Sequence, residues 1–216
     1  MQRAAWIAFD LYGTLLDPAA LLGDEYPETG RAALDDAVLQ AMADTITGEH
    51  RPFPDYLRAA LERRLRIAGA DGDTLDAAMD RARRLPAFPD APPALETLAA
   101  ADYRIAVLTN SAADAAGAAL DAAGLAARVE MVIGADEIGA YKPDLRVYRH
   151  AARRLGVSAD RLCLVTAHAW DVLGARRADW AAAWVAHREQ YLLSTVPEPS
   201  LRAASLAEAA HALSAL

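Results

Sequence analysis

Side chains suited to nucleophilic and acid–base chemistry lie at or close behind several apolar runs of the sequence. Asp10 ends the first run of WIAFDLYGTLLD, Lys142 lies in GAYKPDLRVY, and Asp171 follows RLCLVTA. A carboxylate can attack an electrophilic centre or take a proton, and an ammonium group can keep a nearby carboxylate ionised. Each residue alone has a simpler explanation, because a single Asp after a strand is more often a turn cap.

Hydroxyl, amide and imidazole groups occur at the same kind of position. Thr14 follows a tight turn, Thr109 and Asn110 end the run YRIAVLTN, and His168 follows RLCLVTA. In an open α/β sheet, ligands bind at the carboxyl ends of the parallel strands. Polar groups at several such ends therefore predict one shared site rather than a set of separate turn caps.

Five short apolar runs are typical of buried strands, and helical patterns separate the last four. The expected strands are Ala4–Asp10, Tyr103–Asn110, Val129–Asp136, Arg161–Ala167 and Ala181–His187. Helices are expected from an N-cap at Ser111 to Gly124, and from Asp144 to Gly156. This alternation predicts an α/β fold with a parallel sheet covered by helices.

A long segment between the first two strands interrupts the alternation. It contains ALDDAVLQAMADTI, DYLRAALERRLRIAG and DTLDAAMDRARRL, which are helical in pattern. A connection of this length cannot be a simple loop. We therefore expect a helical cap domain at residues 17–91, inserted into a core of residues 1–16 and 92–216.

Composition narrows the functional classes. The chain has 216 residues and a net charge of −8, with a pI of about 5.1, which disfavours binding to nucleic acid or to an anionic membrane. Its single cysteine, Cys163, cannot form a disulfide within the chain and is expected in the core. No apolar run reaches the ~20 residues that span a bilayer, so a cytoplasmic protein is expected.

Four motifs of this chain, FDLYGTLLD, VLTNS, YKPDLRVY and HAWDVLGA, resemble in their order the four motifs of the haloacid dehalogenase superfamily. The resemblance covers nearly the whole chain, helical insertion included. It implies a Rossmann-like core with Asp10 on the central strand as a covalent nucleophile. D-x-Y-G-T and YKPDxRVY are the forms found in the 2-haloacid dehalogenase (type II) branch. The resemblance thus implies hydrolysis of a short 2-haloalkanoic acid to the 2-hydroxy acid.

The resemblance also implies roles for individual residues. Lys142 would keep Asp10 ionised and stabilise charge during ester hydrolysis, and Asp171 would orient Lys142 or activate water, or else cap the next helix. The catalytic candidates are Asp10, Thr14, Lys142, His168 and Asp171. The substrate-binding candidates are Leu11, Tyr12, Phe53, Thr109, Asn110 and Tyr148. Structural alternatives stay open, since the threonines can satisfy backbone groups and the aromatic residues can pack in the core.

A magnesium-dependent phosphatase of the same superfamily is the main alternative. Such an enzyme has a second Asp two residues after the nucleophile to protonate the leaving alkoxide, where this chain has Tyr12, a poor acid at neutral pH. It also has a carboxylate where this chain has Ala167, which leaves few oxygen ligands for Mg²⁺. Halide leaves without a proton, so we expect a dehalogenase with no metal or other cofactor. A catalytically weak binding protein is a third alternative, which would need neither Asp10 nor Lys142.

Two positions depart from the dehalogenase pattern. His168 stands where these enzymes usually have Asn. The first cap helix of these enzymes has an Arg that receives the halide, and that position falls near Leu34 in this chain. Asn110, Tyr12, His168 or the nearby Arg31 would have to replace that Arg. Neutral donors suit small halides, which predicts a preference for haloacetates. The resemblance also implies a possible homodimer.

Overall fold

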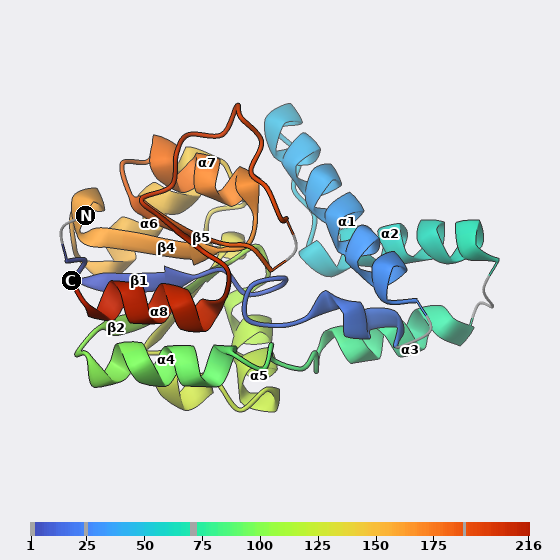
Figure 1. Ribbon diagram of the computed structural model, residues 1–216. Helices are drawn as coiled ribbons and strands as arrows, with labels where there is room; N and C mark the ends of the chain where they lie inside the picture. The colour runs from blue at the N-terminus through green and yellow to red at the C-terminus, as the bar shows by residue number, and fades with distance from the viewer. Residues whose placement is uncertain (1–2, 24–25, 70–72, 188) are drawn as a thin grey trace.

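A six-stranded parallel sheet forms the centre of the computed structural model, which describes residues 3–23, 26–69, 73–187 and 189–216 (Figure 1). The strands are β1 (Trp6–Phe9), β2 (Arg104–Thr109), β3 (Met131–Gly134), β4 (Leu162–Thr166), β5 (Ala181–Val185) and β6 (Leu201–Ala203). Their order is β3-β2-β1-β4-β5-β6, and every neighbouring pair is parallel. The residues that follow β1 therefore lie at the centre of the carboxyl edge of the sheet.

Helices cover both faces of this sheet (Figure 1). They are α4 (Ala91–Ala100), α5 (Ala113–Ala122), α6 (Leu145–Leu155), α7 (Ala169–Arg177) and α8 (Leu206–Ser214), with short 3-10 turns η2 (Ala126–Arg128), η3 (Ala135–Glu137) and η4 (Ala159–Arg161). Side chains alternate between the faces along each strand. In β1, Ile7 and Phe9 pack with α4, α5 and α8, whereas Trp6 and Ala8 pack with α6 and α7.

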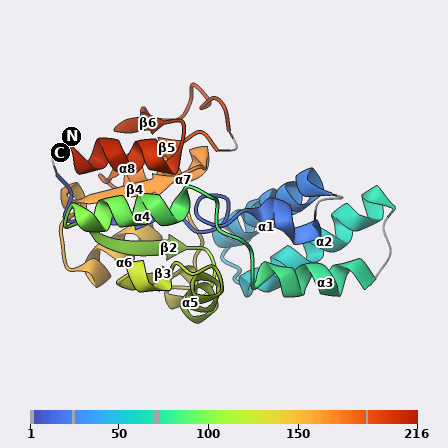
Figure 2. The ribbon, with the colours of Figure 1, turned by 60° about the horizontal axis from the view of Figure 1, so that its bottom comes forward.

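The insertion between β1 and β2 is helical and lies beyond the carboxyl edge of the sheet (Figures 1 and 2). It consists of η1 (Pro18–Leu22), α1 (Pro27–Thr47), α2 (Phe53–Ala68) and α3 (Asp73–Ala82). The buried apolar positions of α1 and α2 recur at helical spacing and join the same hydrophobic cluster. The insertion thus has apolar contacts of its own and reaches the sheet through the edge where Asp10 lies.

The two segments that connect the insertion to the core run side by side. Leu16 and Ala87 form an antiparallel bridge. Asp17 N–H donates to the Pro86 carbonyl at 2.9 Å, and Phe88 N–H donates to the Leu15 carbonyl at 2.9 Å. These bonds fix where the insertion leaves the core and where it returns.

The predicted α/β fold class, a parallel sheet with a helical insertion after the first strand, is confirmed, and the five expected strands are present in slightly shorter form. The sixth strand, β6, was not expected. The predicted N-cap at Ser111 is wrong, because α5 begins at Ala113 and Ala112 holds the N-cap position. Cys163 is buried as expected, and burial raises its thiol pKa to about 12. Within the described ranges, no helix has the length and apolar character to cross a membrane.

Candidate active site

Asp10, Lys142 and Asp171 form a buried charge cluster at the carboxyl edge of the sheet. Lys142 Nζ donates to Asp10 Oδ1 and to Asp171 Oδ2, each at 2.8 Å. The lysine and Asp171 are fully buried, and Asp10 is 4% exposed. The ammonium therefore lies between two carboxylates that come from different strand ends, after β1 and after β4.

Backbone and amide groups after β2 hold the lysine in place. The Lys142 ammonium donates its third hydrogen bond to the Leu108 carbonyl oxygen at 2.8 Å. The Lys142 N–H donates to Asn110 Oδ1, also at 2.8 Å. All three donors of the ammonium are thus used, and its position is tied to the end of the neighbouring strand.

The environment separates the pKa values of the two carboxyl groups. Burial alone would raise the Asp10 pKa, but the charge of Lys142 and a hydrogen bond from His168 bring it well below its ordinary value. The Asp171 pKa is raised, because burial and the charge of Asp10 outweigh the effect of Lys142. Burial lowers the Lys142 pKa, yet the two carboxylates raise it overall. Asp10 is therefore an ionised carboxylate at neutral pH, and Asp171 is the stronger base of the two.

Thr14 and His168 contact the other oxygen of the Asp10 carboxylate. Thr14 Oγ1 donates to Asp10 Oδ2 at 2.8 Å and accepts from the Ala167 N–H at 3.0 Å. His168 Nε2 lies 2.9 Å from the Tyr12 carbonyl oxygen and 3.4 Å from Asp10 Oδ2. A carbonyl can only accept, so Nε2 carries a proton. Both residues thus orient Asp10 from the side opposite Lys142.

Tyr148, another candidate, contacts Asp171 rather than open space. Its hydroxyl donates to Asp171 Oδ1, and its ring is fully buried beside Trp180. Asp171 itself lies in the first turn of α7, where His168 holds the N-cap position, so the alternative of an N-cap role for Asp171 is wrong. The site function and the core function predicted for Tyr148 are therefore compatible.

Gly174 makes this contact possible. A Cβ at Gly174 would lie 2.2 Å from the Tyr148 hydroxyl and 2.5 Å from its Cζ. We expect Gly174→Ala to displace Tyr148 from Asp171, to cost ~1–3 kcal/mol of unfolding free energy by overpacking, and to lower kcat. Chemical denaturation and steady-state kinetics measure both. Gly117→Ala in α5 is the control, because its Cβ would meet nothing within 4 Å and kcat should stay at the wild-type value.

Asn110 and Thr109 differ in whether their side chains keep an unused hydrogen-bonding group. Asn110 is 8% exposed, and its Nδ2 is a buried donor that has no hydrogen-bond partner among the residues that the structure describes. The Thr109 hydroxyl accepts from the Ser111 N–H, which is the backbone role left open for it. Asn110 therefore keeps one unused donor at the carboxyl edge of the sheet, on the residue that holds Lys142 through its Oδ1.

The remaining substrate-binding candidates lie at different depths. The Leu11 side chain is fully buried in the hydrophobic core, and its expected contact with substrate stays a prediction. Tyr12 and Phe53 line the same cavity between the core and the helical insertion. Burial raises the Tyr12 pKa, which makes its phenol a still weaker acid.

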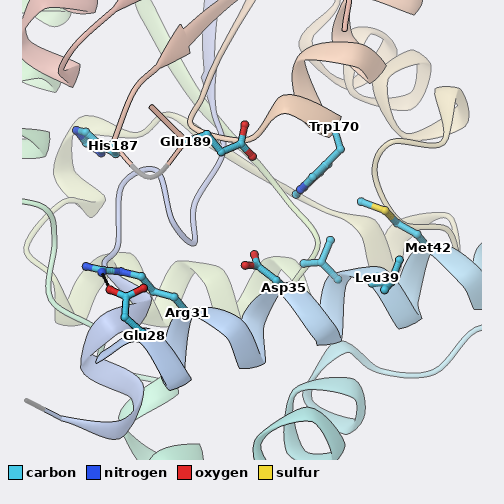
Figure 3. Close-up of a pocket in the computed structure, with 9 residues that line it drawn as sticks. Glu28, Arg31, Asp35, Leu39, Met42, Trp170, His187 and Glu189 are labelled. Atoms are coloured by element: carbon cyan, nitrogen blue, oxygen red, sulfur yellow. Dashed lines mark hydrogen bonds and ion pairs between the residues drawn. The ribbon is translucent and has the colours of Figure 1, made fainter. Parts of the chain in front are cut away.

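Two cavities lie between the insertion and the core. One, of about 500 Å³, has charged walls that include Glu28, Asp35 and Glu189 (Figure 3). The other, of about 400 Å³, contains Tyr12 and Ser111 and has mostly apolar walls. The two cavities thus differ in polarity.

Trp170 is a site residue that sequence reasoning missed. It lines the charged cavity (Figure 3). Its ring stacks on the His168 ring at a centroid distance of 5.0 Å, and the ring centroid lies 5.5 Å from Lys142 Nζ. The only available signal was its place in the HAWD motif, between His168 and Asp171. Trp170 therefore separates the buried charges from the cavity.

Carboxylate and imidazole groups near the site do not form a metal centre. Across the described parts of the chain, no group of three or more His, Cys, Asp or Glu side chains is arranged to hold a metal ion. Lys142 is instead the cation between Asp10 and Asp171.

Comparisons with known proteins relate the chain to one family of hydrolases. The family model for haloacid dehalogenase-like hydrolases matches residues 5–179. The chain is 33% identical over 176 residues to (S)-2-haloacid dehalogenase 4A of Burkholderia cepacia, covering 77% of this chain and 76% of the relative. It is also 33% identical over 195 residues to a phosphoglycolate phosphatase of Caulobacter vibrioides, covering 82% and 76%. A solved dehalogenase structure with an intermediate complex is similar with a TM-score of 0.92 and 26% identity, covering 99% of each chain.

Proposed function

This chain belongs to the haloacid dehalogenase-like hydrolases, and from that membership we propose that it hydrolyses 2-haloalkanoic acids to 2-hydroxy acids through an aspartyl ester. The observation that carries the proposal is the ionised Asp10 carboxylate held by Lys142 at 2.8 Å. Its substrate is accordingly a small molecule. An acid–base role alone would not need a carboxylate whose pKa is lowered so far.

In the first step, Asp10 attacks the carbon that bears the halogen. The new bond joins an Asp10 carboxylate oxygen to C2 of the substrate, and the carbon–halogen bond breaks as halide leaves with its electron pair. The hydrogen bonds from Lys142 and Thr14 orient the carboxylate for this attack. No proton is transferred in this step.

In the second step, water hydrolyses the ester. Asp171, with its raised pKa, takes a proton from water as the water oxygen attacks the Asp10 carbonyl carbon. The Lys142 ammonium stabilises the oxyanion that forms. Collapse breaks the bond between the carbonyl carbon and the substrate oxygen, and Asp171 returns its proton to that departing oxygen, which gives the 2-hydroxy acid. Asp10 keeps one oxygen from water and loses the second water proton to solvent, so that both carboxylates are restored.

Sequence identity does not separate this function from phosphate hydrolysis, because a dehalogenase and a phosphatase are both 33% identical to the chain. The side chains of the site do separate them. Tyr12 and Ala167 stand where a phosphatase needs carboxyl groups, and the ammonium of Lys142 bridges Asp10 and Asp171. These features favour a leaving group that needs neither proton nor metal.

Asn110 is the halide acceptor that we propose in place of the missing Arg. Its Nδ2 is an unused donor, and its Oδ1 is fixed by Lys142. Arg31 lines the charged cavity but is less suitable, because its guanidinium contacts Glu28 and lies 3.7 Å from Asp17. Leu34 contributes only an apolar surface.

We also propose a cytoplasmic homodimer and a helical cap domain at residues 17–91. The exposed Leu39 and Ile46 of α1, at 67% and 85%, support the dimer because they lie seven residues apart on one helix face. The paired connecting segments at Leu16 and Ala87 support the cap boundaries.

Halide release from 2-bromopropanoate with and without EDTA tests the proposed function. We expect equal rates in both conditions, no stimulation by Mg²⁺, and no p-nitrophenyl phosphate hydrolysis above the level of an inactive Asp10→Asn variant. Magnesium-dependent phosphate release without any halide release would instead establish the phosphatase alternative.

A further inference from the structure

The apolar cavity between the insertion and the core is larger than a short haloacid requires. Its volume is about 400 Å³, whereas a water molecule takes up ~30 Å³ of liquid. Its walls come from α1, α2, α3, η1 and α5, and include Leu34, Phe53, Leu57 and Met79. A substrate with only a methyl substituent would leave most of this space unused.

This cavity adjoins the catalytic residues through the loops that carry them. Tyr12 lies two residues after Asp10, Ser111 directly follows Asn110, and both line the cavity. Leu34 is 4% exposed and adds an apolar wall from α1. A group attached to the reacting carbon can therefore extend from the site between α1 and α5.

The two cavities differ in what they can accept. The cavity of Figure 3 has carboxylates of Glu28, Asp35 and Glu189 in its walls, which disfavour an apolar chain. The walls of the apolar cavity include the buried side chains of Leu57 and Leu85. Binding an alkyl group against them removes apolar surface from water, which is favourable in free energy. The charges at the apolar cavity are those of Arg83 and Asp114, both exposed residues.

We propose that this cavity binds an apolar substituent of several carbons on C2 of the substrate, so that medium-chain 2-haloalkanoic acids are the preferred class. The proposal rests on the proposed dehalogenase function. It reverses the preference for haloacetates expected from the missing guanidinium. Leu34 thus selects for the alkyl chain in a position where an Arg would bind halide.

A series of bromoacetate, 2-bromopropanoate, 2-bromohexanoate and 2-bromooctanoate tests this selectivity, because the leaving group stays constant. We expect kcat/KM to rise by about fourfold for each methylene that moves from water into the cavity, until the cavity is filled. A flat or falling series, with 2-bromopropanoate still hydrolysed, overturns the chain-length inference and leaves the dehalogenase function intact. Failure to release bromide from any member overturns both.

A cavity-filling variant locates the effect. Ala118 lies on α5 in the cavity wall and is exposed, so Ala118→Leu narrows the cavity without entering the core. We expect the ratio of kcat/KM for 2-bromooctanoate to that for 2-bromopropanoate to fall at least tenfold. Ala122→Leu, an exposed position on α5 outside the cavity wall, is the matched control and should keep the wild-type ratio. An unchanged ratio in Ala118→Leu overturns the proposal.

Discussion

Replacing the nucleophile in Asp10→Asn is expected to lower haloacid turnover by at least ~10⁴-fold while the chain still folds. A neutral amide is a far weaker nucleophile than a carboxylate, and it cannot form the ester. Asparagine keeps the shape of the side chain and can still accept the hydrogen bond from Thr14. The loss should therefore appear in kcat rather than in the amount of folded protein.

A single turnover of wild-type enzyme in H₂¹⁸O tests the same step directly. Because water attacks the Asp10 carbonyl carbon, the label should enter the Asp10 carboxylate in the first turnover and the product only later. Mass spectrometry of the peptide that contains Asp10 measures the incorporation. Label found only in the product would rule out the ester and make Asp10 a base for direct attack by water.

Asp17→Asn is the matched control for this variant. Asp17 lies in the same motif, but its carboxylate caps η1 by accepting from the Ala19 N–H at 2.9 Å. Asn also caps helices well, so stability and turnover should remain close to the wild-type values. A comparable loss in Asp17→Asn would mean that the motif acts through local structure rather than through the Asp10 nucleophile.

Strand ends were the most predictable part of the molecule. Buried parallel strands are continuous apolar runs, so the first polar residue after each run marks the carboxyl edge. This reasoning placed Asp10, Asn110 and His168 on one edge, where they are found. The short strand β6 could not be predicted, because Leu201–Ala203 has no apolar run of its own and pairs only at the sheet margin.

Predictions from local sequence failed at positions where tertiary contacts determine the structure. Ser111 is a good N-cap residue by type, yet its side chain is hydrogen-bonded to Tyr12 and the helix starts two residues later. The role of the Leu108 carbonyl, which accepts a hydrogen bond from Lys142, could not be predicted either, because a backbone acceptor has no sequence signature.

Lys142 is the only lysine in the sequence, although the chain has 22 basic residues. Its surroundings account for the choice, because a compact ammonium with three donors fits among Asp10, Asp171 and the Leu108 carbonyl. A planar guanidinium presents five donors in a fixed fork and would leave some of them unpaired here. The site therefore requires lysine rather than any cation.

Loss of this ammonium in Lys142→Met is expected to lower kcat on the order of 10³-fold. Two effects combine. The Asp10 carboxylate loses the charge that opposes the rise of its pKa on burial, so less of it is ionised at neutral pH. The oxyanion formed in the second step loses its cationic partner, so the ester is hydrolysed slowly.

Exposed Arg146 provides a matched control within the same motif. Its guanidinium pairs with Asp144 and is 60% exposed, so Arg146→Met should keep the wild-type rate. Near-normal turnover in Lys142→Met would contradict the role proposed for the lysine. A similar loss in both variants would show that the motif is sensitive to any change, and thermal unfolding of each protein would detect such a structural cause.

The pH profile and the intermediate separate the two effects of Lys142→Met. Activity requires an ionised Asp10, so a raised Asp10 pKa removes activity on the acid side and moves the rising limb of the profile to higher pH. If the second step is also slowed, raising the pH restores ester formation but not turnover. Acid quenching of a reaction run at alkaline pH should then trap an ester on Asp10, visible as a mass increase equal to the substrate acid minus HX. Recovery of full turnover at high pH, without trapped ester, would confine the lysine to ionising the nucleophile.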